Sequence, residues 1–310
     1  MNKQLKDFIK RTRLHLKFLF YKRNYSPESV VFILCDTRSG STWLMETIQK
    51  ATGCEIIWEP FHSTGINVIK PRIQSRVFPD HLNQPGIIKE FEAIFTGKKY
   101  NIWTEKMNPI IPKGRMPFPL VKSVRIHPSL DWLSANFPTN HPPIFLVRHP
   151  IPTSLSKIKN FDLTDNIISE ETQNHIPPHI SKDSIPKIST ALEKQVLYWC
   201  IHNYTGLKRN TEKKWITVFY EDMVLNPEQV LPKIPCLRDF DLEKVLSDIN
   251  KPSKSDFSGS YTKNNEDQLR RWERAIDDET KGKLQKILDL FDIDEYSCFD
   301  VLPIKQDAIH

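Results

Sequence analysis

The hydrophobic residues of this 310-residue chain form short uninterrupted runs that alternate with amphipathic stretches. The run Val30-Val31-Phe32-Ile33-Leu34-Cys35 has the length of a strand and contains no polar residue. Such a run is typical of a parallel strand whose two faces are both covered. Further strands are predicted at 55–58, 101–106, 120–125, 144–148 and 215–220.

Stretches with apolar residues at helical spacing lie between the predicted strands. Helices are predicted at 87–95, 129–137, 153–160, 188–209 and 277–291, with a further helix that starts near Thr42 and ends at Gly53. Strands that alternate with helices predict an α/β fold, in which a parallel sheet lies between two layers of helices. We expect one domain over 26–310, with a long proline-punctuated loop at 162–186.

The first 25 residues are basic and amphipathic and predict a separate N-terminal helix. Lysine and arginine interleave there with leucine, isoleucine and phenylalanine. This pattern fits a helix that packs its apolar stripe against the domain, and it also fits a helix that lies on an anionic membrane surface. Peripheral membrane contact through residues 1–25 therefore stays open.

Composition narrows the class of protein further. Lysine and arginine (44) exceed aspartate and glutamate (38), and the resulting net charge of +6 suits an anionic ligand or a membrane surface without naming one. The five cysteines form no CxxC pair, so we expect neither a disulfide framework nor a zinc site, and a reducing, cytoplasmic environment. No apolar run approaches the roughly 20 residues that span a bilayer.

The strongest candidate chemistry follows the first predicted strand, where the chain turns into a helix. This turn contains Arg38, Ser39, Gly40, Ser41 and Thr42. Free backbone N–H groups and the helix dipole favour an anion at such a turn, and the glycine allows close approach of the backbone. An ordinary capped helix is the simpler interpretation. The arginine, the glycine and three hydroxyls together favour an anion site, and the absence of GxxxxGK[ST] spacing disfavours ATP.

A second arginine, Arg148, ends another predicted buried strand. Pro150 and Pro152 follow it, so the next helix is predicted to begin at Thr153. Ligands of open α/β sheets bind beyond the carboxyl ends of the strands. Because Arg38 and Arg148 both lie at such ends, we expect two separate anionic groups to bind at one edge of the sheet. A structural ion pair is the alternative for Arg148.

Three motifs resemble elements of the sulfotransferases that use 3′-phosphoadenosine 5′-phosphosulfate (PAPS). Residues 38–44, Arg-Ser-Gly-Ser-Thr-Trp-Leu, resemble the 5′-phosphosulfate loop of that family. Arg148 at its strand end, with Ser156 eight residues later, resembles the 3′-phosphate element, although His149 stands where the family usually has aspartate. Residues 219–228 resemble the later Tyr-Glu-Asp-Leu…Pro-Glu segment.

The resemblance implies a P-loop-NTPase-like, three-layer sulfotransferase fold and PAPS as co-substrate. The residues implied for binding PAPS are Arg38, Ser39, Gly40, Ser41, Thr42, Trp43, Arg148 and Ser156. Lys263 lies where relatives carry a cofactor-contacting loop ahead of a tryptophan-containing helix, and a flexible surface loop is the alternative there. We expect no metal, because arginine, lysine and loop amides supply the positive field.

Sulfuryl transfer needs a base for the acceptor hydroxyl and positive charge for the leaving group. A glutamate in the segment corresponding to Glu59 serves as the base in tyrosylprotein sulfotransferases and certain bacterial glycolipid sulfotransferases. His62 is the competing candidate, since histidine titrates near neutrality, and a structural role fits it equally. Lys106, at the end of the predicted strand 101–106, resembles a lysine directed at the sulfate or the bridging oxygen, although a solvated lysine fits nearly as well. Arg38 and Lys106 would stabilise the developing charge.

These observations predict a sulfotransferase that transfers a sulfuryl group from PAPS to a hydroxyl of a carbohydrate, glycolipid or related metabolite. We expect residues 65–86 and 162–186 to select the acceptor, and we expect no nucleic acid partner. The alternatives are a P-loop kinase that uses ATP and a non-catalytic, membrane-associated nucleotide-binding protein. The missing Gly-Lys pair speaks against the kinase, and the presence of Glu59 and Lys106 speaks against the non-catalytic protein.

Overall fold

The computed structural model describes residues 25–69, 76–109, 116–165, 167–246 and 265–304, together with Thr12 and Arg23. The predicted N-terminal helix therefore lies almost entirely outside the described residues, and Lys263 lies outside them as well. None of the helices in the described ranges combines the length and the apolar character that a bilayer-spanning segment needs.

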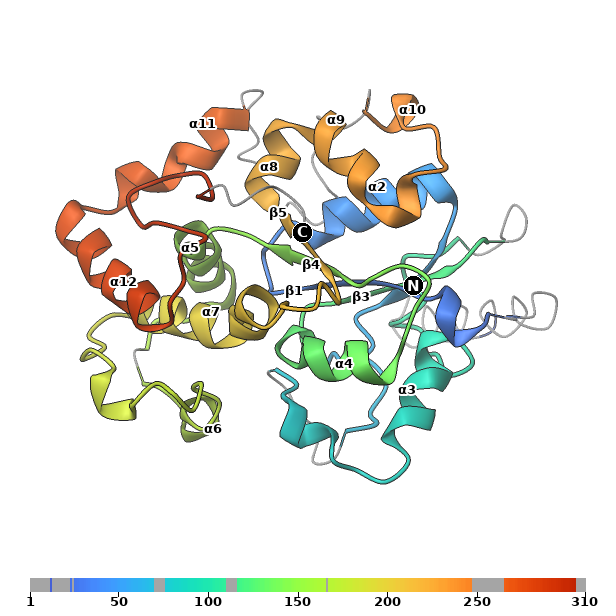
Figure 1. Ribbon diagram of the computed structural model, residues 1–310, viewed down its shortest axis with the longest axis horizontal. Helices are drawn as coiled ribbons and strands as arrows, with labels where there is room; N and C mark the ends of the chain where they lie inside the picture. Colours follow the sequence, from blue (N-terminus) through green and yellow to red (C-terminus); the bar gives the residue numbers. More distant parts are fainter. Residues whose placement is uncertain are drawn as a thin grey trace.

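Five parallel strands form one sheet at the centre of the described chain (Figure 1). They are β1 (Val31–Cys35), β2 (Glu55–Trp58), β3 (Pro119–Ser123), β4 (Ile144–Val147) and β5 (Ile216–Phe219), and their order in the sheet is β2-β3-β1-β4-β5. The central strand β1 places Ile33 opposite Lys122 of β3 and Cys35 opposite Leu146 of β4. The predicted parallel α/β architecture is confirmed.

The helices of the described residues are α2 (Ser41–Thr52), α3 (Ile87–Phe95), α4 (Leu130–Asn136), α5 (Pro150–Phe161), α6 (Glu170–Gln173), α7 (Ala191–Lys208), α8 (Tyr220–Leu225), α9 (Pro227–Val230), α10 (Glu243–Leu246), α11 (Asn265–Arg270) and α12 (Asp278–Leu290). In Figure 1, α2, α8 and α9 lie on one side of the sheet, and α3 and α4 lie on the other. Helix α3 has the bounds that its sequence pattern predicts.

Both faces of the sheet are covered, which explains the uninterrupted apolar run of β1. Val31 and Ile33 pack into the core on the α2 side, whereas Phe32 and Leu34 pack into the core on the other face. All residues of β1 are buried. A strand with two apolar faces has no polar alternation, as buried parallel strands require.

The prediction of a strand at 101–106 is wrong, because these residues form turns. The side chain of Asn101 accepts the N–H of Thr104 at 2.9 Å, and the hydroxyl of Thr104 accepts the N–H of Asn101 at 3.0 Å. Such local side-chain bonds occupy backbone groups that a strand would use in the sheet. Lys106 therefore ends no strand.

Two smaller differences concern α5 and the loop after it. Helix α5 begins at Pro150 rather than at Thr153, because a proline in the first turn removes only an N–H that would have no helical partner. The predicted loop at 162–186 is largely irregular, and it contains α6 and a short 3₁₀ helix, Lys182–Ser184. At the end of α2, Gly53 is left-handed and caps the helix as predicted.

Candidate active site

The turn between β1 and α2 has two residues with left-handed backbone, Arg38 at φ 71° and Gly40 at φ 83°. A Cβ atom at Gly40 would lie 2.4 Å from ring carbons of Tyr220, so this glycine is needed for close packing as well as for its φ. Arg38 has a Cβ, and holding it in this region costs about 1–3 kcal/mol. Strain of this kind concentrates at sites that bind ligands.

The two predicted anion-binding elements meet at the carboxyl ends of β1 and β4. Arg38 Nε donates to Ser156 Oγ at 2.9 Å, and Arg148 Nη1 donates to the carbonyl oxygen of Arg38 at 3.1 Å. The Arg148 guanidinium lies 4.6 Å from the centre of the Tyr220 ring. The structure therefore brings Arg38, Arg148 and Ser156 together, although they are far apart in the sequence.

Buried polar atoms at this junction have no protein partner in the described structure. Ser39 is 1% exposed, and its Oγ makes no hydrogen bond. The Nε atom of Arg148 is also buried and makes no hydrogen bond. Ser41, Thr42 and Trp43 form the first turn of α2, at the positive end of its dipole. Buried donors without partners fit a ligand that offers several anionic oxygens, as a phosphate or sulfate does.

A buried ion cluster, not predicted from the sequence, anchors the start of this turn. Asp36 is fully buried and its carboxylate contacts Lys157 of α5 and Arg76. It also accepts the N–H of Thr37 at 2.6 Å. Burial alone would raise the pKa of Asp36, but the charges of Lys157 and Arg76 outweigh it and hold this pKa well below its usual value. Because Lys157 adjoins Ser156, the cluster joins the loop to the helix that carries the second anion element.

Replacing Asp36 with asparagine should destabilise the fold by about 3–5 kcal/mol, because it leaves the buried ammonium of Lys157 without its counter-charge. Urea unfolding followed by tryptophan fluorescence measures this loss. Asp131→Asn is the matched control, since the partly exposed pair of Asp131 with Arg209 is expected to contribute at most about 1 kcal/mol. Equal stability of the two variants would contradict the anchoring role of Asp36.

His149 is fully buried beside Arg148. It stands where the PAPS-dependent sulfotransferases, which this segment resembles, usually have aspartate. Its Nδ1 accepts the N–H of Ile151 at 3.2 Å and caps α5, and its Nε2 lies 3.0 Å from the carbonyl oxygen of Ser297. Its backbone N–H donates to Glu221, whose other oxygen accepts the hydroxyl of Tyr296. Burial lowers the pKa of His149 to about 4, so the ring is a neutral part of the scaffold.

His149 contributes stability that is lost as the pH drops from 6.5 to 4, because the unfolded chain takes up the proton of His149 before the folded protein does. Glu221 gives the opposite slope between about pH 4.5 and 7, since burial raises its pKa to about 7 and the folded state keeps its proton longer. The contribution of His149 is therefore measured as the difference between the wild type and His149→Asn in urea unfolding at a series of pH values, and we expect the variant to lack a loss of up to about 1.4 kcal/mol per pH unit as the pH falls through this range. An unchanged slope in His149→Asn would count against a neutral buried ring.

Glu59 directly follows β2 and lies against Lys122 of β3. The two side chains form a buried ion pair, and each residue is 4% exposed. The second carboxylate oxygen of Glu59 accepts the N–H of Val124 at 3.0 Å. The backbone of Glu59 is left-handed at φ 39°, which is a strained position for a residue with a side chain.

Lys106 and His62 lie on the two tryptophans beside Glu59. Lys106 Nζ is 3.7 Å from the ring centre of Trp103 and 4.5 Å from that of Trp58. Partial burial lowers the pKa of Lys106, the charge of Glu59 opposes this shift and Lys122 adds to it. The His62 ring stacks on Trp103 at 4.3 Å. Glu59, Lys106 and His62 therefore form one group.

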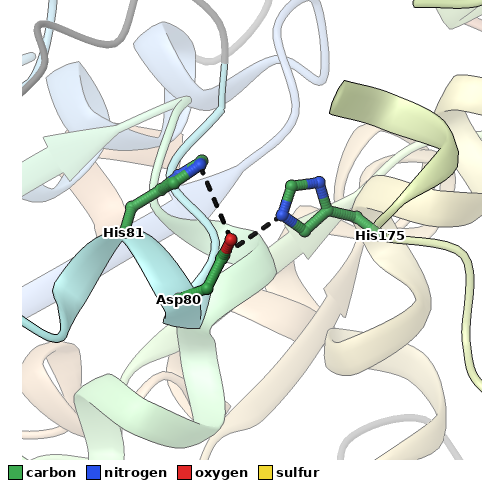
Figure 2. Close-up of side chains that lie close together, drawn as sticks. All are labelled: Asp80, His81 and His175. Carbon is green, nitrogen blue, oxygen red and sulfur yellow. Dashed lines mark hydrogen bonds and ion pairs between the residues drawn. The ribbon is translucent and has the colours of Figure 1, made fainter. Parts of the chain in front are cut away.

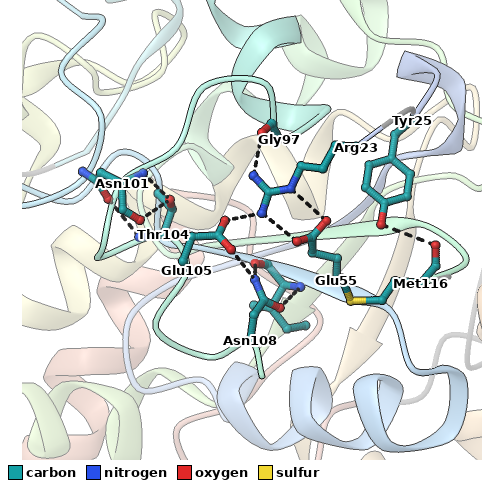
Figure 3. A network of polar contacts seen from close by, with 10 residues as sticks. Arg23, Tyr25, Glu55, Gly97, Asn101, Thr104, Glu105, Asn108 and Met116 are labelled. Atoms are coloured by element: carbon teal, nitrogen blue, oxygen red, sulfur yellow. Dashed lines mark hydrogen bonds and ion pairs between the residues drawn. The ribbon is translucent and has the colours of Figure 1, made fainter. Parts of the chain in front are cut away.

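A buried polar network holds the 101–108 turns against the edge strand β2 (Figure 3). The Arg23 guanidinium contacts the carboxylates of Glu55 and Glu105, at 2.6 and 2.5 Å. The Asn108 side chain exchanges two hydrogen bonds of 2.7 Å with the backbone of Ile56, as a neighbouring strand would. These contacts fix the segment that carries Lys106 and Trp103.

The Glu59 group and the anion-binding turn lie close to the same end of β1. Burial raises the pKa of Cys35, the last residue of β1, to about 12, and the charges of both Lys122 and Glu59 act on it. A small cavity is lined by Phe61, His62, Ile66, Asn67, Val68, Ile69 and Val77. The cavity belongs to the stretch that was expected to select the acceptor.

Sequence reasoning missed Lys122, Asp36, Arg76 and Tyr220 as members of this site. A lysine inside the apolar strand β3 was a readable signal, since lysine is almost never fully buried unless it is paired. Asp36 also stood at the carboxyl end of a buried strand. Tyr220 belonged to the 219–228 segment that resembles the family, but its contact with the turn was not predicted. Arg76 had no such signal. Only the folded chain brings these two residues to the turn.

No protein-family model matches the chain, and no curated protein matches it. Among solved structures, it is similar to the sulfotransferase domain from the Synechococcus PCC 7002 olefin synthase, with 17% identity, a TM-score of 0.49, and coverage of 88% of this chain and 97% of that chain. It is also similar to the sulfotransferase domain from the curacin biosynthetic pathway, with 14% identity, a TM-score of 0.46, and coverage of 85% and 97%. A third similar structure is retinol dehydratase in complex with androsterone and inactive cofactor PAP, with 12% identity, a TM-score of 0.41, and coverage of 90% and 85%. Two of these three structures are sulfotransferase domains, and the third is a complex with the inactive cofactor PAP.

Proposed function

We propose that this protein is a PAPS-dependent sulfotransferase that transfers a sulfuryl group to a hydroxyl. The observation that carries the proposal is the junction of Arg38, Arg148 and Ser156 around the buried, unpartnered hydroxyl of Ser39. Two anion-binding elements that resemble the 5′ and 3′ elements of one family meet there at the carboxyl ends of adjacent parallel strands.

Each residue has a separate role in this proposal. Arg148 and Ser156 hold the 3′-phosphate, and Arg38, Ser39 and the first turn of α2 hold the 5′-phosphosulfate. Asp36 and its partners keep the two elements in register. Bound PAPS supplies the sulfuryl group and a bisphosphate leaving group.

Glu59 takes the proton from the acceptor hydroxyl while the acceptor O–S bond forms and the S–O bond to the bisphosphate breaks. Lys122 and the N–H of Val124 hold this carboxylate in place, and each of its oxygens retains a lone pair for the proton. Lys122, Lys106 and Arg38 supply positive charge where the leaving group develops its negative charge. His62 is held by Trp103 and by Thr64, at 2.8 Å, which favours a positioning role over that of base.

For the acceptor, we propose a carbohydrate, a glycolipid or a related metabolite. The Glu59 segment resembles that of bacterial glycolipid sulfotransferases and that of tyrosylprotein sulfotransferases alike, so the choice of this class rests on the cavity. The cavity beside His62 combines apolar side chains with the amide of Asn67, as an amphiphilic acceptor requires.

Incubation of the full chain with PAPS labelled in its sulfate, together with separated glycan, lipid and protein fractions of a cell extract, tests this function. We expect label in the glycan or glycolipid fraction. Label in protein alone would overturn the proposed acceptor class while keeping the activity. No label in any fraction would contradict the sulfotransferase and favour the non-catalytic nucleotide-binding protein.

A further inference from the structure

Three side chains outside the proposed transfer site converge on one point of the surface (Figure 2). Asp80 and His81 belong to the 3₁₀ helix η2 (Pro79–Leu82), and His175 follows α6. Asp80 Oδ1 lies 3.1 Å from His175 Nε2, and Asp80 Oδ2 lies 4.0 Å from His81 Nε2. The three ligand atoms all lie within 4.8 Å of one another.

We propose that Asp80, His81 and His175 form a binding site for a divalent transition-metal ion, with Zn²⁺ as the preferred occupant. Two imidazole nitrogens and one carboxylate oxygen are a donor set that zinc accepts, and the ligand separations require only small movements to close around one ion. Imidazole donors select against Mg²⁺ and Ca²⁺, which prefer oxygen ligands.

Phe78 orients both histidines. The His175 ring stacks on the Phe78 ring at 3.5 Å, with 9° between their planes. His81 Nδ1 accepts the backbone N–H of Phe78 at 3.1 Å, which turns its Nε2 toward Asp80. The stacked His175 ring is therefore held in place before an ion binds, so less of its rotamer entropy is lost on binding.

The cluster is open to solvent. The Asp80 side chain is 64% exposed, so an ion can enter from solvent and water can complete its coordination.

The two histidines are not equal ligands. A metal at His81 Nε2 requires the ring proton on Nδ1, where the ring now accepts the N–H of Phe78, so binding there sacrifices that hydrogen bond. We therefore expect His175 and Asp80 to contribute more affinity than His81. An ion held by all three would tie η2 to the stretch after α6, two segments far apart in the sequence.

Calorimetric titration of Zn²⁺ into the metal-free full chain at pH 7.5 tests the site. We expect one ion per chain, bound tighter than about 0.1 mM, with no response to Mg²⁺. His175→Ala and Asp80→Asn should each weaken binding by about 10-fold or more, and His81→Ala by less. His179→Ala is the matched control, because His179 lies in the same stretch as His175 and outside the cluster.

The visible absorption of Co²⁺ gives a second readout that does not depend on stability. Bands of a cobalt–imidazole complex should appear with the full chain and be lost in Asp80→Asn/His81→Ala/His175→Ala. Saturable Zn²⁺ binding that survives in this triple variant, or no saturable binding by the full chain, would overturn the proposal. Circular dichroism of each variant separates the loss of a ligand from the loss of the fold.

Discussion

Replacing Arg148 with alanine should weaken the binding of adenosine 3′,5′-bisphosphate by about 10- to 100-fold, because a charge-assisted hydrogen bond contributes about 1.5–3 kcal/mol. In the proposed site Arg148 pairs with the 3′-phosphate, and it also supports the carbonyl oxygen of Arg38. Its removal therefore affects both anion-binding elements. Calorimetric titration of the bisphosphate into the wild-type and variant proteins measures the change in Kd.

Arg209→Ala is the matched control for this experiment, because it also removes one arginine but from a surface pair with Asp131. Its Kd should equal that of the wild type. Arg148→Lys should recover only part of the affinity, since an ammonium cannot reproduce the planar, two-point contact of a guanidinium. Unchanged binding in Arg148→Ala would show that Arg148 does not bind the 3′-phosphate.

Replacing Glu59 with glutamine should reduce the rate of sulfuryl transfer by about 10²- to 10⁴-fold, the contribution expected of a general base. Glutamine has the same shape, and its carbonyl oxygen can still accept the N–H of Val124, but it cannot take the acceptor proton. It also leaves the buried ammonium of Lys122 without its counter-charge, so the rates are compared at a temperature at which the variant is folded. The bisphosphate should bind as in the wild type, because Glu59 has no assigned contact with it. Turnover of labelled PAPS, measured beside calorimetry, separates the two effects.

His62→Asn and Glu90→Gln serve as the comparisons for Glu59→Gln. Glu90 forms an exposed pair with Lys99, so its replacement should leave the rate unchanged. His62→Asn should cause a smaller loss than Glu59→Gln, because His62 is proposed to position Trp103. Full activity of Glu59→Gln together with an inactive His62→Asn would transfer the role of base to His62.

The sheet could be read from the sequence because burial on both faces leaves a plain signature. The apolar runs of β1 and β4 mark strands, and the glycine that ends α2 marks its boundary. The order of the strands in the sheet could not be predicted, because it depends on which strands form hydrogen bonds with one another. The prediction of a strand at 101–106 was wrong, because the side chains of Asn101 and Thr104 form hydrogen bonds with the backbone of this segment and hold it in turns.

The candidate site was predictable where residues adjoin in sequence and was missed where they meet only in space. Arg38, Ser39 and Gly40 stand in one turn, so their chemistry is visible in a short motif. The partner of Asp36 on α5, Lys157, and the partner of Glu59 on β3, Lys122, come from other elements. Gly40 illustrates the same limit: its motif suggests close approach of a phosphate, whereas the structure adds the close approach of the Tyr220 ring.

Calorimetric titration of adenosine 3′,5′-bisphosphate in the absence of magnesium tests the central claim most directly. We expect saturable binding with one ligand per chain and an accompanying rise in Tm, since a ligand that binds only the folded state stabilises it. ATP, with or without magnesium, should bind far more weakly, because it has no 3′-phosphate for Arg148 and Ser156. Failure of the bisphosphate to bind, or tighter binding of magnesium–ATP, would contradict the sulfotransferase and favour the kinase.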